Sequence, residues 1–174
     1  MVRLTIFLIL SIFLIIWSRK SLKNRKVHGF YRFFAFESIL ALIIVNSVNW
    51  FTNPFSVIQI ISWILLLVSI VIATQGFYLL HKIGKPEKEI EETSILVKTG
   101  IYKCIRHPLY SSLILLAWGS FLKDISLLPA GLAIAATIFL VVTAIVEEKE
   151  NLQRFGDEYT HYMNFTKRFI PFIV

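Results

Sequence analysis

The feature that most constrains this chain is its division into five apolar blocks separated by polar, largely basic segments. The blocks are 16, 19, 24, 14 and 20 residues long and span Val2–Trp17, Phe33–Phe51, Val57–Leu80, Leu109–Leu122 and Leu127–Val146. A helix that crosses a bilayer needs roughly 20 apolar residues, within a range of about 17–25. The second, third and fifth blocks meet this length, the first is marginal, and the fourth needs Pro108 in its first turn to reach the headgroups. The pattern predicts an all-α integral membrane protein with about five transmembrane helices.

The composition excludes most other classes of protein. Apolar residues make up 56% of the 174 residues and the mean hydropathy is +0.71, whereas soluble domains are nearer ~45–50% apolar. A chain this short cannot bury so much apolar surface internally. Its single cysteine, Cys104, excludes an intrachain disulfide and provides too few thiolates for a zinc cluster. We therefore expect one membrane domain over residues 1–174, with no metal site.

The basic residues predict the orientation of the chain in the membrane. Sixteen of the eighteen Lys and Arg residues lie in segments 18–32, 81–108 and 147–174. Basic loops stay on the cytosolic side, so we expect the N-terminus outside and the C-terminus in the cytosol. The pattern does not distinguish a bacterial or archaeal plasma membrane from the endoplasmic reticulum. The net charge of +7 favours anionic membrane lipids as partners, and no basic, aromatic-rich face suggests nucleic acid.

The first block resembles a secretory signal only in length. A basic cluster follows it and no small-x-small cleavage site does, so we expect it to be retained as a helix. Glu37, inside the second block, is a costly intramembrane carboxylate that usually faces a partner or a polar cavity. The sequence leaves open whether Glu37 is simply bonded within the helix bundle.

Polar residues gather in a cytosolic cap formed by segments 81–108 and 147–174. Only four residues, 123–126, separate the fourth and fifth blocks, so their helices form a tight antiparallel hairpin. The start of one helix and the end of the other then meet at the same membrane surface, which brings Arg106 and His107 beside Glu147 and Glu148. An amphipathic helix over 148–163 is predicted to lie on the membrane, because five apolar or aromatic residues share one face: Leu152, Phe155, Tyr159, Tyr162 and Met163.

Two motifs in this cap carry a resemblance to a known family. The first is Gly-x-Tyr-x-x-x-Arg-His-Pro-x-Tyr over Gly100–Tyr110, and the second is Glu-Glu-x-x-x-Leu-x-x-Phe-Gly-x-x-Tyr-x-x-Tyr over Glu147–Tyr162, followed by Arg168 and Pro171. In order, spacing and membrane position they resemble the isoprenylcysteine carboxyl methyltransferase family, with the phospholipid N-methyltransferases as more distant relatives. The resemblance covers roughly residues 77–174. The first two helices match this family only in hydropathy.

The resemblance implies a membrane methyltransferase that uses S-adenosylmethionine and a lipid-like or prenylated acceptor from the bilayer. Carried over by position, the cofactor-binding residues are Ser94, Ile95, Leu96, Val97, Tyr102, His107, Pro108, Leu109, Tyr110, Glu147 and Glu148. Carboxylates can accept hydrogen bonds from the cofactor's ammonium and ribose hydroxyls, and basic groups or helix-start N–H groups can bind its carboxylate. The candidate catalytic residues are Arg106 and Arg168.

The chain departs from this family where a substrate carboxylate is bound. Thr143 occupies the position of the family's substrate-binding arginine, so Arg106 or Arg168 would have to replace it. We therefore expect weak turnover of a farnesylated cysteine carboxylate and expect Thr143→Arg to raise it. The acidic run of Glu87, Glu89, Glu91 and Glu92 suits either a cationic acceptor or plain solvation.

Two other functions remain open from the sequence. One is a membrane reductase using NADPH, because sterol-type reductases end in a similar aromatic and basic tail. The other is a non-catalytic membrane scaffold or binding protein, which the missing arginine favours.

Overall fold

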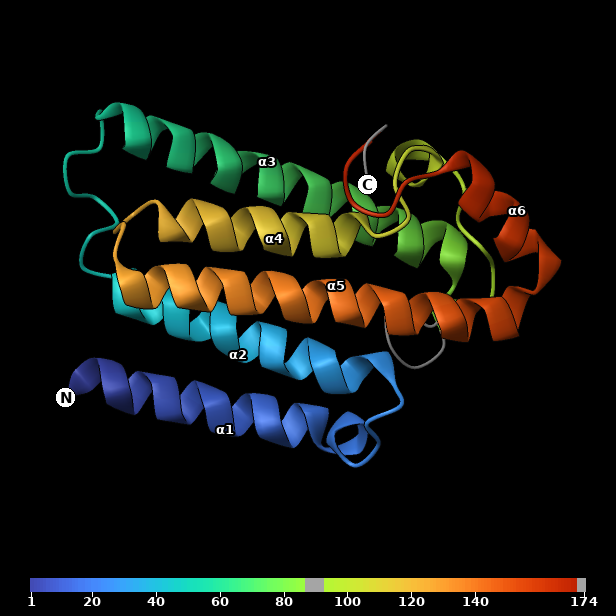
Figure 1. Ribbon diagram of the computed structural model, residues 1–174, viewed down its shortest axis with the longest axis horizontal. Coiled ribbons are helices and arrows are strands. Elements are labelled where there is room, and N and C mark those ends of the chain that lie inside the picture. Colours follow the sequence, from blue (N-terminus) through green and yellow to red (C-terminus); the bar gives the residue numbers. More distant parts are fainter. Residues whose placement is uncertain (87–92, 172–174) are drawn as a thin grey trace. The chain divides into compact units, whose positions relative to one another are not determined.

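A computed structural model describes residues 1–86 and 93–171, so the acidic run over 87–92 lies outside the described residues. The chain forms helices and two isolated β-bridges within these ranges. Figure 1 shows the order of the elements: α1 (Val2–Leu22), α2 (His28–Asn46), α3 (Val57–Leu79), η1 (Leu80–Gly84), η2 (Gly100–Lys103), α4 (Pro108–Phe121), α5 (Leu127–Phe155) and α6 (Asp157–Phe165).

The predicted membrane fold is confirmed. Four helices in the described part of the chain are long and apolar enough to cross a bilayer, namely α1, α2, α3 continued through η1, and α5. The apolar α4 is shorter, with 14 residues, and it begins at Pro108 as the sequence predicted. Proline suits the first turn of a helix because the N–H it lacks has no helical partner there.

The end of α5 differs from the predicted boundary. The helix continues to Phe155 instead of ending at Val146, because the polar stretch after Val146 is rich in good helix formers such as Glu, Lys, Leu and Gln. Gly156 then interrupts the amphipathic helix that was predicted over 148–163. Its positive φ of 53° is a conformation that glycine adopts readily, so the predicted segment is divided between the end of α5 and α6.

By their internal contacts, the residues divide into two compact units. The first unit comprises Met1–Leu67 and Ile114–Glu147, and the second comprises Val68–Leu113 and Glu148–Val174. The polar motifs of the cap fall in the second unit, apart from Glu147.

In the first unit, polar side chains join the helices within the apolar packing. Ser11 of α1 donates a hydrogen bond to Glu37 Oε2 of α2 at 2.7 Å, and Figure 1 shows these two helices side by side. Asn46 Nδ2 donates to the Ser120 carbonyl at 2.7 Å, which ties α2 to α4. Glu37 is therefore bonded to a neighbouring helix, the simpler of the two alternatives that the sequence left open.

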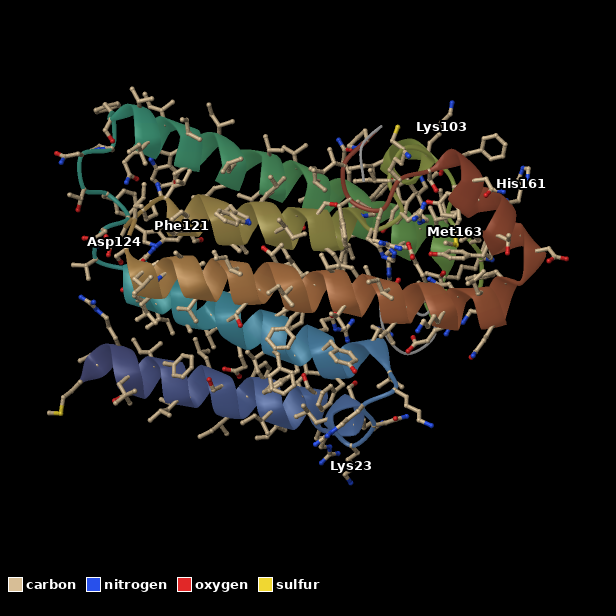
Figure 2. All side chains as sticks on the ribbon, viewed as in Figure 1. Lys23, Lys103, Phe121, Asp124, His161 and Met163 are labelled. Atoms are coloured by element: carbon tan, nitrogen blue, oxygen red, sulfur yellow. The ribbon has the colours of Figure 1, made fainter. Side chains whose placement is uncertain are left out.

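The turn between α4 and α5 contains a buried lysine. Lys123 Nζ lies 3.4 Å from the centre of the Trp63 ring and 3.1 Å from Gln59 Oε1. Burial lowers the pKa of Lys123, because an ammonium group loses its hydration there. Figure 2 shows the neighbouring Phe121 and Asp124 at this turn. Lys123 is one of the two basic residues that the sequence predicts on the outer side of the membrane. It is thus held by aromatic rings and by the side-chain amide of Gln59.

In the second unit, a small apolar core supports the cap. Leu80, Val97 and Tyr102 are buried together, and Leu79, Ile83, Ile101 and Leu109 pack against them. Gly100 has a φ of +58°, and a Cβ atom there would lie 2.6 Å from Leu79 Cδ1. Both the backbone conformation and the space therefore require glycine at the start of the first motif.

Candidate functional site

The candidate site is formed by the segment before α4 and the C-terminal tail, which lie side by side in the second unit (Figure 1). The Arg106 N–H donates to the Lys167 carbonyl at 2.8 Å, and the Lys167 N–H donates to the Cys104 carbonyl at 3.1 Å. The His107 N–H donates to the Arg168 carbonyl at 3.1 Å. These bonds form a short parallel β-bridge between Ile105 and Lys167. They hold the tail against the first turn of α4.

Side chains strengthen this junction. Ser111 Oγ on α4 donates to the Phe169 carbonyl at 2.9 Å. The His107 ring stacks on the Tyr110 ring, with 5.5 Å between ring centres, and lies 6.1 Å from the Phe169 ring. The Arg-His-Pro-x-Tyr motif therefore packs directly on the C-terminal tail, although the two segments are about sixty residues apart in the sequence.

A cluster of charged side chains, termed the Glu148 cluster, lies at this junction and comprises Arg106, His107, Glu148 and Arg168. Arg168 Nη2 and Nε donate to Glu148 Oε2 and Oε1 at 2.6 and 3.1 Å, a bidentate pair. Arg106 Nε donates to Glu148 Oε1 at 2.9 Å. His107 Nε2 lies 3.4 Å from the same oxygen. One carboxylate thus holds two guanidinium groups and faces an imidazole.

The members of the Glu148 cluster differ in their exposure to solvent. The side chains of Glu148 and Arg106 are 5% and 9% exposed, whereas that of Arg168 is 29% exposed. The hydrogen bonds that Arg168 donates to Glu148 raise the pKa of Arg168. Arginine is always charged in proteins, so two guanidinium groups and one carboxylate leave the cluster with a net charge of +1 when His107 is neutral.

Arg106 also caps the end of α6. Its Nη1 group donates to the Met163 carbonyl at 3.3 Å, to the Thr166 carbonyl, and to Thr166 Oγ1 at 3.4 Å. The last carbonyls of a helix have no partner within the helix, and basic side chains often satisfy them. Figure 2 shows Met163 on α6, the helix whose end Arg106 caps.

The strip over 94–97 and Tyr102, which the sequence predicted to bind a cofactor, also belong to the second unit. Ser94 Oγ donates to the Lys85 carbonyl at 3.2 Å, and both Ser94 and Ile95 are exposed. Val97 and Tyr102 are buried in the apolar core. Tyr162 was not among the site residues predicted from the sequence. Its Oη donates to the Tyr102 carbonyl at 2.6 Å. Burial raises the pKa of Tyr162, and its place in the second motif was the available signal.

Glu147 and Thr143 belong to the first unit. Both are buried, and Thr143, with 0% exposure, donates from Oγ1 to the Phe139 carbonyl of its own helix at 2.6 Å. Consecutive helical residues point about 100° apart, so Glu147 and Glu148 face different directions. The described residues contain no group of three His, Cys, Asp or Glu side chains that could hold a metal ion. The roles assigned to individual site residues from the sequence stay predictions.

Comparison with known families identifies the chain's relatives. Residues 11–166 match the family described as "Protein of unknown function (DUF1295)". The chain belongs to this family. The match extends from the middle of α1 through α6 and includes both motifs of this DUF1295 chain. The Glu148 cluster therefore lies within the matched residues except for Arg168, two residues beyond them. No solved structure shows significant similarity to the chain.

Several curated proteins are also similar to this DUF1295 chain. A methanethiol S-methyltransferase of Crocosphaera subtropica is 29% identical over 115 residues, which cover 65% of this chain and 44% of that protein. Methanethiol S-methyltransferase 1 of Bradyrhizobium diazoefficiens is 33% identical over 95 residues, covering 52% and 30%. A methanethiol S-methyltransferase of Pseudomonas deceptionensis is 25% identical over 71 residues, covering 41% and 26%. The chain spans less than half the length of each of these relatives.

Proposed function

We propose that this protein is a membrane methyltransferase that uses S-adenosylmethionine and methylates an apolar thiol reaching the site from the bilayer. Three curated relatives are named methanethiol S-methyltransferases, and the two motifs resemble a second group of membrane methyltransferases. The observation that carries the choice of acceptor is the pairing of Arg106 and Arg168 with Glu148. Arg106 is thereby engaged within the protein, and the exposed edge of Arg168 can serve one carboxylate, which in this proposal is that of the cofactor.

The residues near the start of α4 fit the chemistry of S-adenosylmethionine. The Glu148 cluster has a net positive charge that complements the cofactor's carboxylate. The resemblance assigns Glu147 to the cofactor as well, where a carboxylate would accept from an ammonium group or a ribose hydroxyl. The rings of His107 and Tyr110 stack beside the cluster, and the tilted Phe169 ring lies 6.1 Å from that of His107. Both polar and apolar parts of the cofactor therefore have matching groups among these residues.

When bound, S-adenosylmethionine would supply a methyl group on a cationic sulfonium: a thiolate, formed by loss of the thiol proton to solvent, would bond in line to the methyl carbon as the carbon–sulfonium bond breaks and S-adenosylhomocysteine leaves. The protein's contribution is alignment and the exclusion of water, since such a displacement requires no proton transfer to the methyl group itself. The junction of α4 with the tail would contribute to alignment, because backbone bonds fix Arg106 and His107 against Lys167 and Arg168. A thiol acceptor also needs no arginine at the position of Thr143.

Ligand binding tests the donor. We expect S-adenosylhomocysteine to raise the melting temperature of the purified protein in detergent, whereas NADPH should not. A ligand at 100 times its Kd stabilises the folded state by about 2.7 kcal/mol, which a thermal-shift measurement resolves. Stabilisation by NADPH alone would support a reductase. Stabilisation by neither ligand would support a non-catalytic scaffold.

Methyl transfer tests the acceptor in the same preparation. With radiolabelled S-adenosylmethionine, we expect methylation of methanethiol and longer alkanethiols and little methylation of farnesylcysteine. A matched alkanol with the same tail serves as the control for the thiol group. Efficient methylation of farnesylcysteine with no transfer to any thiol would contradict the proposed acceptor while leaving the donor intact.

Substitution of Glu147 tests its predicted contact with the cofactor. Glu147→Gln is expected to weaken S-adenosylhomocysteine binding by about 1–3 kcal/mol, the range for losing a hydrogen bond to a charged group. Isothermal titration calorimetry in detergent measures this change. Glu158→Gln is the matched control, because Glu158 is an exposed carboxylate that pairs with the exposed Lys98. Equal affinity for the wild type and Glu147→Gln would remove Glu147 from the site.

A further inference from the structure

We propose that Arg168 contacts the carboxylate of the cofactor's amino-acid moiety and that Arg106 is a positioning residue that holds the site together. This assignment rests on the proposed function, because it requires a cofactor that carries an α-amino acid. It distinguishes two arginines that the sequence alone presented as equivalent candidates. The distinction comes from the contacts, exposure and charge of the Glu148 cluster.

The contacts of Arg106 are directed into the protein. Its Nε donates to Glu148, and its Nη1 donates to carbonyls at the end of α6, at Met163 and Thr166. Its side chain is 9% exposed. A guanidinium held by a carboxylate on one edge and by helix carbonyls on another serves the fold first. Arg106 therefore orients Glu148 and closes α6 against the segment before α4.

The contacts of Arg168 are concentrated on one edge. Nε and Nη2 bind the two oxygens of Glu148, which uses two of the five N–H donors of a guanidinium in a fixed geometry. The side chain remains 29% exposed, about three times as exposed as that of Arg106. Arg168 is thus both anchored by Glu148 and accessible to a ligand.

The charge of the cluster favours an anion at Arg168. Within the Glu148 cluster, two guanidinium groups share one carboxylate, which leaves an excess positive charge when His107 is neutral. A ligand carboxylate at the accessible edge of Arg168 would make the cluster neutral. The backbone of Arg168 lies next to the first motif, since the His107 N–H donates to the Arg168 carbonyl.

Two ligands that differ only in the amino-acid moiety test the assignment. S-adenosylhomocysteine carries the carboxylate and the ammonium, whereas 5′-methylthioadenosine has the same adenosine and thioether without them. We expect Arg168→Gln to weaken S-adenosylhomocysteine binding by about 10- to 100-fold, the effect of losing a charge-assisted hydrogen bond. The affinity for 5′-methylthioadenosine should change less than about twofold. Calorimetry in detergent measures both ligands with each variant.

Matched variants make the result specific. Lys167→Gln removes the same charge from the adjacent, exposed residue and should leave both affinities unchanged. Arg168→Lys keeps the charge and should recover part of the lost affinity. Arg106→Gln should lower the melting temperature and weaken both ligands to a similar degree, as expected for a positioning residue.

Several outcomes would overturn the assignment. An equal loss of both ligands in Arg168→Gln would make Arg168 a structural residue, and unchanged affinity for S-adenosylhomocysteine would exclude it from the site. Loss of co-purified anionic phospholipid with unchanged S-adenosylhomocysteine binding would assign Arg168 to a lipid headgroup instead. If the wild type binds neither ligand, the proposed function fails, and this result is distinct from a failure of the Arg168 assignment alone.

Discussion

Replacing Glu148 with leucine is expected to lower the free energy of unfolding by about 3–5 kcal/mol, the range for breaking a buried ion pair from one side. The reason is that Arg106 and Arg168 both depend on this carboxylate, and Arg106 is almost fully buried. Without Glu148, the cluster would hold two neighbouring guanidinium groups with no carboxylate between them. Denaturation of the purified protein in detergent, followed by tryptophan fluorescence, measures the change.

Two further variants separate charge from shape in this experiment. Glu148→Gln keeps the size of the side chain and should be destabilised nearly as much as the leucine variant, because it also removes the negative charge. Glu158→Gln breaks the exposed pair with Lys98 and should change stability by less than about 1 kcal/mol. A Glu148→Leu protein as stable as the wild type would show that the arginines do not depend on the carboxylate.

Introducing an arginine at position 143 is expected to destabilise the folded protein by about 3 kcal/mol or more. Thr143 is 0% exposed and bonds to its own helix at Phe139. A guanidinium there would overpack a closed site in a membrane helix, where a charged residue alone costs about 2.5–3.5 kcal/mol or more. The yield of monodisperse protein and its melting temperature measure the effect, with Thr143→Ser as the mild control.

The expected instability of Thr143→Arg affects the test of farnesylcysteine as an acceptor, which the sequence suggested. Thr143→Arg was expected to restore the family's substrate-binding arginine and raise turnover of farnesylcysteine. The burial of Thr143 makes loss of folding the dominant effect, so the substitution is a poor route to that activity. A stable Thr143→Arg protein that methylates farnesylcysteine would contradict this view and restore the original expectation.

The sequence alone determined the class of fold and the location of the cap. Apolar blocks of membrane-spanning length require helices, because a bilayer offers no hydrogen-bond partners to an open backbone. Pro108 marked the start of α4, since proline suits only the first turn of a helix. The short connection between the fourth and fifth blocks predicted that Arg106 and His107 would approach the Glu147–Glu148 pair. The structure places both residues beside Glu148.

Only the tertiary structure decided how the charges of the cap are paired. Glu148 binds Arg106, 42 positions away, and Arg168, 20 positions away, whereas the resemblance had assigned the two acidic residues alike to the cofactor. Residue spacing gave no indication that Arg106 caps α6 or that Gly156 divides the predicted amphipathic helix. Helix length and hydropathy are properties of neighbouring residues and can be read along the chain. The partner of a buried charge depends on which distant segments meet, and here the tail pairs with the segment before α4 through backbone bonds that any residue could form.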